Sequence, residues 1–197
     1  MITLYHAPQS RSSRIVWLLE ESGEPYKLEI VTIPRRDGSG APDAKNPNPD
    51  KKVPTLVHDG NLVMESAAIC LYLSDLFPKA KLGPQVGDPD RGAYVTWLAW
   101  YAATLEPTLI AKLAGRTETD PEEQKAYDQM AARLRNALTQ GPYLLKSGFS
   151  TADILVASAF QFARPMMPAG EVFDAYVKRL EQRPAFARAS AKERGPS

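Results

Sequence analysis

The stretch that decides the fold contains Val53-Pro54-Thr55-Leu56, followed nine residues later by Glu65-Ser66-Ala67-Ala68-Ile69. A proline stands directly before a short apolar strand, where it is unwelcome because it cannot donate a hydrogen bond to a neighbouring strand. An acid and a hydroxyl residue then open a helix, whose N-terminus can hold a carboxylate. The stretch therefore predicts a free backbone edge beside an anion-binding helix end, which together suit a small anionic peptide.

Outward from this stretch, the first eighty residues alternate strand and helix signals. Ser22-Gly23 stops the first helix, and His58-Asp59-Gly60 is a hairpin signal. The segment before Val53 is rich in Pro, Gly, Asn and Asp and is predicted as loop. The predicted order is strand 2–5, helix from Ile15, strand 26–33, loop 34–52, strands 55–57 and 61–63, and helix 65–76.

The second part of the chain carries only helical signals beyond a Pro- and Gly-rich linker, residues 78–89. Asp88 is predicted to cap a helix that begins at Pro89 and bends at Pro107. Asp120-Pro121 marks another helix start. We therefore predict two domains, an α/β domain over residues 1–80 and an all-helical domain over residues 88–197.

One helix start in the second part is specified with particular care. Ser150 is placed as an N-cap, Asp153 as the third-position acid that reaches back to it, and Phe149 with Ile154 as a hydrophobic staple. The helix that follows is apolar nearly all round, which predicts the buried core helix of the second domain. Asp153 is therefore assigned to folding and not to catalysis.

The bulk composition excludes several classes of function. The 197 residues carry a formal charge of +1, which gives no reason to expect nucleic acid or an anionic membrane as partner. The basic C-terminal stretch is read as a solvated tail; its basic residues are Lys178, Arg179, Arg183, Arg188, Lys192 and Arg194. Cys70 is the only cysteine, no secretory signal or spanning segment is evident, and the predicted location is cytoplasmic.

Few residues can carry chemistry. Two histidines and one cysteine do not make the usual zinc site, so no metal is expected. The turn from Ala7 to Arg14 remains, with three hydroxyls and two arginines at a helix N-terminus. Capping by Ser10 or Ser12 is one interpretation. The other is that a hydroxyl and the helix dipole stabilise a bound thiolate, since lowering a thiol pKa by two units takes about 2.7 kcal/mol.

Together these features make the chain resemble a glutathione transferase over nearly its full length. The motifs that carry the resemblance are Leu4-Tyr5-His6-Ala7-Pro8 with Ser10, Asn48-Pro49, Val53-Pro54-Thr55-Leu56, Glu65-Ser66-Ala67-Ala68-Ile69, Ser150-Thr151-Ala152-Asp153 and Arg183-Pro184-Ala185-Phe186. The resemblance implies a thioredoxin-like N-terminal domain, an all-α C-terminal domain, glutathione as co-substrate and a homodimer.

The resemblance also implies roles for single residues. Pro54 matches the family's cis-proline, so that Val53 pairs with the cysteinyl part of glutathione. Glu65 and Ser66 match the pair that holds the γ-glutamyl end. Lys52, and less surely Lys51, stand where residues often reach the glycyl carboxylate. Arg11 is a candidate glutathione-binding residue on other grounds, as a cation in the turn that can help to stabilise the thiolate. Ser10 matches the activating hydroxyl of the delta- and theta-like classes.

The turn departs from other classes of the family. It has no cysteine, which disfavours mixed disulfides with glutathione, and it lacks the Ser-Ser-Cys-Ser run of zeta-like isomerases. Ser12 and Ser13 leave the choice of activating hydroxyl open. We expect a detoxifying transferase that joins the glutathione thiolate to a small hydrophobic electrophile. The electrophile is expected between this turn and the helix that carries Trp97, Trp100, Tyr101 and Glu106.

Two other functions fit the same residues. One is a glutathione-dependent peroxidase, which would use the same thiolate. The other is a non-catalytic glutathione-fold module that binds a protein or ligand.

Overall fold

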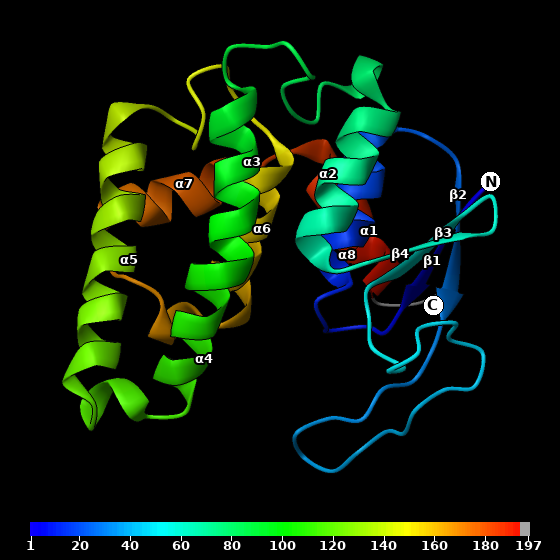
Figure 1. Ribbon diagram of the computed structural model, residues 1–197, viewed down its shortest axis with the longest axis horizontal. Coiled ribbons are helices and arrows are strands. Elements are labelled where there is room, and N and C mark those ends of the chain that lie inside the picture. The colour runs from blue at the N-terminus through cyan, green and yellow to red at the C-terminus, as the bar shows by residue number, and fades with distance from the viewer. Residues whose placement is uncertain (194–197) are drawn as a thin grey trace.

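The structure, a computed structural model, describes residues 1–193. Its elements are β1 (Ile2–His6), α1 (Ser13–Ser22), β2 (Tyr26–Ile30), β3 (Thr55–His58), β4 (Asn61–Met64), α2 (Ser66–Leu76), α3 (Arg91–Trp100), α4 (Glu106–Leu113), α5 (Pro121–Gln140), α6 (Thr151–Phe162), α7 (Glu171–Glu181) and α8 (Pro184–Glu193). The predicted fold class is confirmed: a thioredoxin-like N-terminal domain with a four-stranded sheet is followed by an all-helical domain (Figure 1). The boundaries at residues 80 and 88 stay a prediction.

The sheet has the strand order β2-β1-β3-β4. Strand β1 pairs in parallel with β2, and β3 pairs antiparallel with both β1 and β4. The predicted hairpin between β3 and β4 is confirmed, and its turn residues Asp59 and Gly60 have φ values of 49° and 83°. Two successive positive φ angles are what the type I′ hairpin turn requires. The strand predicted over 26–33 ends earlier, at Ile30.

One apolar core runs through both parts of the molecule. Leu4 and Leu56 from the sheet, Leu18 from α1 and Ile69 from α2 are fully buried in it, together with Leu155 from α6. Helix α6 is buried on nearly every side, as its apolar sequence predicts. The sheet domain and the helical domain therefore share packing, and the position of one constrains the position of the other.

The capping box predicted at the start of α6 is confirmed. The Asp153 carboxylate accepts hydrogen bonds from the backbone N–H of Ser150 and of Leu144, each at 2.9 Å. It also accepts one from the Tyr176 hydroxyl of α7 at 3.1 Å. Asp153 thus ties three segments of the helical domain together while it is fully buried.

The long helix before α5 is interrupted where proline is expected to disturb it. Helix α3 begins at Arg91, after Asp90, and not at Pro89 as predicted. It continues into a π-helical turn, Tyr101–Leu105, before α4 begins. Pro107 lacks an N–H, and its ring crowds the carbonyl four residues earlier, so the backbone widens in the preceding turn. This wider turn faces the sheet domain.

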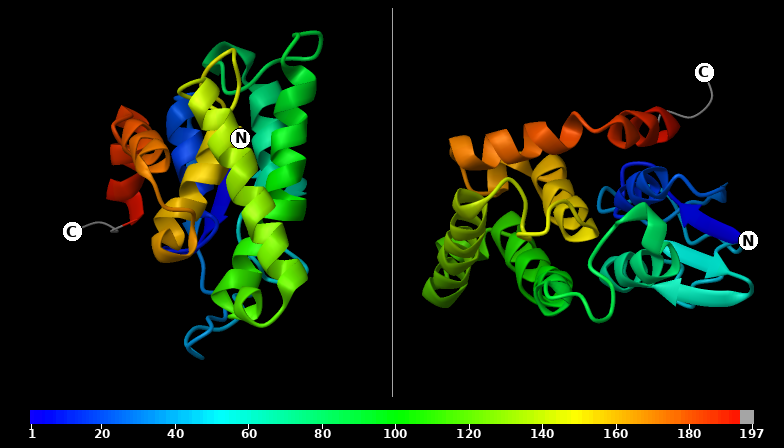
Figure 2. Two further views of the ribbon diagram at one scale, coloured as in Figure 1. Left: turned by 90° about the vertical axis from the view of Figure 1, so that its left-hand side faces the viewer. Right: turned by 90° about the horizontal axis from the view of Figure 1, so that it is seen from above.

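Helix α8 lies against α1, which corrects the prediction of a solvated basic tail (Figure 2). Arg183 makes a bidentate ion pair with Glu21, with N–O distances of 2.6 and 2.8 Å. Arg188 and Lys192 both contact Glu20. These basic residues were misjudged because their acidic partners are more than 160 residues away in the chain. Arg194 lies outside the described residues.

No helix within residues 1–193 is long and apolar enough to cross a bilayer.

Candidate active site

A cavity of about 700 Å³ lies between the sheet domain and the π-helical turn with α4. Its walls come from the loop before β3, from the start of α2, from the turn before α1, and from the helical domain. The residues that line it are Arg11, Ile33, Pro34, Asn48, Asp50, Lys51, Lys52, Val53, Pro54, Met64, Glu65, Ser66, Ala67, Tyr101, Ala102, Glu106, Pro107 and Ile110. Six of the seven residues assigned to glutathione from the sequence, all but Ser10, therefore meet at one cavity.

The backbone edge of the cavity is the segment directly before β3. The Val53–Pro54 peptide bond is cis. Ladder pairing begins only at Thr55, and within residues 1–193 the Val53 backbone N–H and C=O have no hydrogen-bond partner in the chain. An unpaired donor and acceptor on one residue can bind an extended peptide as an added strand would.

The start of α2 supplies the polar end of the cavity. Glu65 precedes the helix with φ at 65°, an uncommon backbone conformation for a residue with a side chain. Its carboxylate makes no hydrogen bond or ion pair with any residue that the structure describes. Ser66, the first residue of the helix, is buried and lines the cavity. The helix N-terminus and the Ser66 hydroxyl suit a carboxylate, and Glu65 suits an ammonium group.

The two lysines at the cavity differ in what they can reach. The Lys51 ammonium donates to the backbone carbonyl of Asn46 at 2.7 Å. Lys52 is largely exposed, and its ammonium lies 3.4 Å from Asp50 in a loose surface pair. Lys52 is therefore the cation free to turn toward an anion in the cavity, while Lys51 already holds the loop.

The three hydroxyls of the turn before α1 have different surroundings. Ser12 is fully buried, so it does not meet the cavity. The Ser10 hydroxyl is partly buried, donates to the Ala7 carbonyl at 2.7 Å and lies 2.7 Å from the Ser12 hydroxyl. Ser13 Oγ lies 3.4 Å from the Ser10 nitrogen. Ser10 itself is not among the lining residues, although its neighbour Arg11 is.

Charged groups from both domains meet on the side of the cavity formed by the turn before α1, the π-helical turn and the start of α4. Arg11 donates to the Glu106 carboxylate, and the buried Arg14 donates to the Tyr101 hydroxyl at 2.7 Å. Burial raises the pKa of the Tyr101 hydroxyl, which keeps it neutral. Of the residues expected near an electrophile, Tyr101 and Glu106 line the cavity.

The two tryptophans expected there do not line the cavity. The guanidinium of Arg133 from α5 lies over the Trp97 and Trp100 rings, 4.7 and 4.8 Å from their centroids. These aromatic rings thus pack inside the helical domain, and the spacing of aromatic residues alone does not separate pocket from core.

Metal and thiol chemistry have no support from the side chains described. Residues 1–193 contain no group of three or more His, Cys, Asp or Glu side chains placed to hold a metal ion. Cys70, the only cysteine of the chain, is fully buried on α2, and burial raises its pKa to about 12. Cys70 is therefore not available as a nucleophile.

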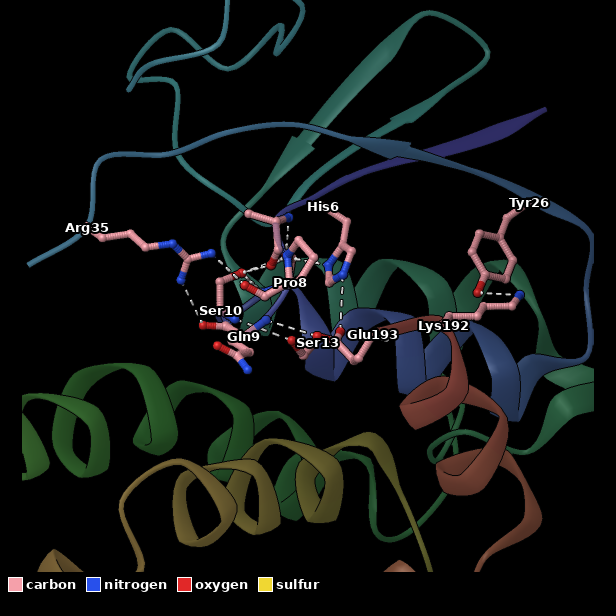
Figure 3. Close-up of polar contacts among 11 residues, drawn as sticks. His6, Pro8, Gln9, Ser10, Ser13, Tyr26, Arg35, Lys192 and Glu193 are labelled. Atoms are coloured by element: carbon pink, nitrogen blue, oxygen red, sulfur yellow. Dashed lines mark hydrogen bonds and ion pairs between the residues drawn. The ribbon is translucent and has the colours of Figure 1, made fainter. Parts of the chain in front are cut away.

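Sequence reasoning missed two residues beside the turn. His6, at the end of β1, is fully buried against Ser12, with 2.8 Å between Nδ1 and Oγ. Glu193 of α8 reaches the same turn and accepts a hydrogen bond from the Gln9 backbone N–H at 2.9 Å (Figure 3). A histidine directly before a serine-rich turn was a usable signal, but nothing in the sequence connects it to a glutamate 187 positions later.

A thioredoxin-like sheet and an all-helical layer enclose a cavity with an unpaired backbone edge, and such a site suits a small peptide. Residues 10–76 match the family model described as glutathione S-transferase, N-terminal domain. Glutathione S-transferase 3 of Schizosaccharomyces pombe is 34% identical over 111 residues, which cover 56% of this chain and 45% of that protein. The chain is thus similar to glutathione S-transferases, and the family model matches its N-terminal domain.

Solved structures agree over nearly the whole chain. A glutathione S-transferase from Actinobacillus pleuropneumoniae superposes with a TM-score of 0.83 at 25% identity, covering 99% of this chain and 94% of the other. A sphingomonad glutathione S-transferase, solved in complex with glutathione, superposes with a TM-score of 0.80 at 24% identity, covering 98% and 100%. At 24% identity, the similarity to the sphingomonad structure shows the fold alone.

Proposed function

We propose that the protein joins the thiolate of glutathione to small hydrophobic electrophiles. The observation that carries the proposal is the unpaired Val53 edge beside the Glu65–Ser66 helix start. Glutathione offers a matching cysteinyl backbone, an ammonium group and two carboxylates. The cavity offers a complementary group for each, which is the arrangement a tripeptide of this charge pattern requires.

Each part of glutathione has a partner in this proposal. Val53 pairs with the cysteinyl backbone, Glu65 with the γ-glutamyl ammonium, and Ser66 with the γ-glutamyl carboxylate. Lys52 takes the glycyl carboxylate in preference to Lys51, whose ammonium already binds Asn46. The thiol then lies toward the turn before α1.

We assign Ser10 as the hydroxyl that stabilises the thiolate, in a serine-activated, delta- or theta-like manner. Ser12 is too deeply buried for this role. With an aryl halide, the sulfur forms a bond to the ring carbon and the halide leaves with the electron pair of the broken bond. Binding both reactants side by side supplies proximity, and the lowered thiol pKa supplies the nucleophile.

Replacing Ser10 with alanine tests this assignment. We expect kcat with an aryl halide to fall at least tenfold near neutral pH, because one donor to the thiolate is worth about one pKa unit. The affinity for glutathione, measured by calorimetry, should change less than about twofold, since Val53, Glu65 and Ser66 supply the binding.

Ser13→Ala is the matched control, and it should retain kcat. Equal activity of Ser10→Ala and the wild type would refute the assignment of Ser10. Glutathione binding without turnover on a panel of aryl halides, epoxides, isothiocyanates and hydroperoxides would instead favour a binding module. Turnover of hydroperoxides alone would favour a peroxidase.

We also propose a homodimer in the cytoplasm. Leu62 on the edge strand β4 and Val95 on α3 are apolar side chains exposed in the single chain, and their burial in a dimer would be favourable. Light scattering after gel filtration tests the oligomeric state.

A further inference from the structure

Behind Ser10 a line of polar side chains leads from the turn to α8. The Ser10 and Ser12 hydroxyl oxygens lie 2.7 Å apart. Ser12 Oγ lies 2.8 Å from His6 Nδ1, and His6 Nε2 lies 3.1 Å from the Glu193 carboxylate. Every step is of hydrogen-bond or ion-pair length, and the line joins β1, the turn before α1 and α8 (Figure 3).

The two middle members of this line are isolated from solvent. His6 and Ser12 are both fully buried. Within residues 1–193, His6 Nε2 makes no hydrogen bond, but it lies 3.1 Å from the Glu193 carboxylate at ion-pair distance, while Nδ1 lies beside Ser12. A buried imidazole with a carboxylate on one side and a hydroxyl on the other has the arrangement that lets a histidine exchange protons with that hydroxyl.

The Glu193 carboxylate, 3.1 Å from Nε2, favours the ring form of His6 that carries its hydrogen on Nε2. A carboxylate only accepts hydrogen bonds, so the neutral ring carries its hydrogen on Nε2, and Nδ1 accepts from the Ser12 hydroxyl. Ser12 Oγ can then accept from Ser10. In this state the Ser12 hydrogen points toward His6, and the Ser10 hydroxyl has two acceptors at 2.7 Å, the Ala7 carbonyl and Ser12 Oγ.

Protonation of Nδ1 reverses the direction of the hydrogens. Nδ1–H then donates to Ser12 Oγ, which also lies 3.2 Å from the backbone N–H of Ala7. The Ser12 hydroxyl turns its own hydrogen toward Ser10, and the Ser10 hydrogen is directed outward. An outward hydrogen is what a thiolate beside Ser10 needs.

We propose that His6 is the proton acceptor for the glutathione thiol, reached through Ser10 and Ser12, and that Glu193 positions His6 for this task. The inference rests on the proposed function. The S–H bond of glutathione breaks and its proton passes to Ser10 Oγ. The Ser10 proton passes to Ser12 Oγ, and the Ser12 proton forms the new N–H bond at His6 Nδ1. The electron pair stays on sulfur, and the imidazolium ion faces the Glu193 carboxylate.

The charged groups around His6 fit this role. Burial raises the pKa of Glu193, but the adjacent His6 ring and the hydrogen bond from the Gln9 N–H outweigh burial and hold that pKa below its usual value. Glu193 is therefore ionised and available as a counter-ion. Arg35, from the loop after β2, donates to the Pro8 carbonyl at 2.7 Å and not to His6. Lys192 of α8 is held by Glu20 and Tyr26.

The test compares the ionisation of bound glutathione in three proteins. Ultraviolet absorbance reports thiolate formation as the pH of the binary complex is varied, and kcat and KM are measured with an aryl halide. Glu193→Gln keeps a hydrogen-bond acceptor but removes the counter-charge of the imidazolium ion. We expect it to raise the pKa of the bound thiol by about one unit and to lower kcat about tenfold at about pH 6.5, with KM for glutathione changed less than about twofold.

Raising the pH above the shifted thiol pKa should restore kcat in Glu193→Gln, because the thiol then ionises without His6. Glu20→Gln is the matched control: it weakens the same α1–α8 interface, at Arg188 and Lys192, but does not contact His6. It should leave the thiol pKa unchanged. His6→Asn should raise the pKa of the bound thiol more than Glu193→Gln does. If His6→Asn does not fold, Glu193→Gln still tests the proposal, because the Glu193 side chain is 21% exposed and its replacement is tolerated more easily.

An unchanged thiol pKa in Glu193→Gln, with normal glutathione binding, would overturn the proposal and leave Glu193 as a clamp on the Gln9 backbone. An equal shift in Glu20→Gln would also overturn it, because helix docking would then explain the effect. A wild-type protein that binds no glutathione would refute the proposed function itself, and this outcome is separate from the other two.

Discussion

At the scale of single residues, two carboxylates have pKa values shifted in opposite directions, because burial dominates at one and hydrogen bonding at the other. Asp153 is fully buried, and burial raises its pKa to about 6, even though Leu144, Ser150 and Tyr176 all donate to it. Glu193 has a lowered pKa, since its hydrogen bonds outweigh its partial burial. Asp153 therefore contributes to the stability of the folded protein in its protonated form, and Glu193 contributes in its ionised form.

The pH dependence of stability reports on Asp153. Its pKa rises from 3.8 in the unfolded chain to about 6 in the folded protein, so its protonated form contributes stability that is complete below about pH 4. This contribution is lost as pH rises through about 6. We expect the wild type to lose about 2 to 3 kcal/mol relative to Asp153→Asn between these pH values, measured by urea unfolding.

The exposed Asp128→Asn on α5 is the control, and its stability relative to the wild type should show no comparable change over this range. If the difference in unfolding free energy between the wild type and Asp153→Asn does not change with pH, the hydrogen bonds to Asp153 compensate its burial fully.

At the scale of elements, α8 holds the face of α1 that the sheet does not cover. Phe186 packs edge-on against Trp17, with 4.9 Å between ring centroids. Arg183 joins Glu21 and also lies over the Phe149 ring, 3.6 Å from its centroid. Glu21 is 8% exposed, so its charge depends on Arg183 for compensation.

Arg183→Ala should lower the free energy of unfolding by about 2 to 3 kcal/mol, because it leaves the Glu21 carboxylate buried without its cation. Chemical denaturation measures the change. The double variant Arg183→Ala/Glu21→Ala should recover part of the loss, and Lys178→Ala, at an exposed position of α7, should have almost no effect. A double variant as unstable as the sum of the two single variants would contradict the coupling.

Local signals in the sequence predict those elements whose causes are local. The Asp59-Gly60 turn and the Ser150–Asp153 capping box depend on neighbouring residues, and both were predicted correctly. The docking of α8 on α1 depends on Glu20 and Glu21, more than 160 residues away, and was missed. The cavity residues before β3 were found because proline there has a strong local signature.

At the scale of the whole molecule, the cavity lies between two domains that share one core. The cavity proposed for glutathione is lined by Val53, Glu65 and Ser66 of the sheet domain and also by Tyr101 and Glu106 of the helical domain. A ligand of the folded state alone stabilises it by mass action. The proposed site therefore predicts that glutathione stabilises the protein as a whole and not one domain.

Glutathione at about one hundred times its dissociation constant should stabilise the protein by about 2.7 kcal/mol and raise Tm by about 5 to 10 °C in a thermal melt. Ser66→Ala, which removes the hydroxyl at the α2 N-terminus, should reduce the Tm rise at the same glutathione concentration to about half. Ser39→Ala in the exposed loop should keep the full rise. Two separate melting transitions, of which only one shifts, would contradict the shared core.

The reach of α8 back to the first turn has a consequence for the order in which the protein is made. His6 leaves the ribosome while Glu193 is still untranslated, so the buried imidazole meets its carboxylate only after nearly the whole chain has been synthesised. A contact that spans 187 positions closes late, because the loop entropy must be overcome first. A nascent chain that stops before α8 would therefore contain the Val53 backbone edge. It would lack the Glu193 carboxylate that positions His6, the proposed proton acceptor.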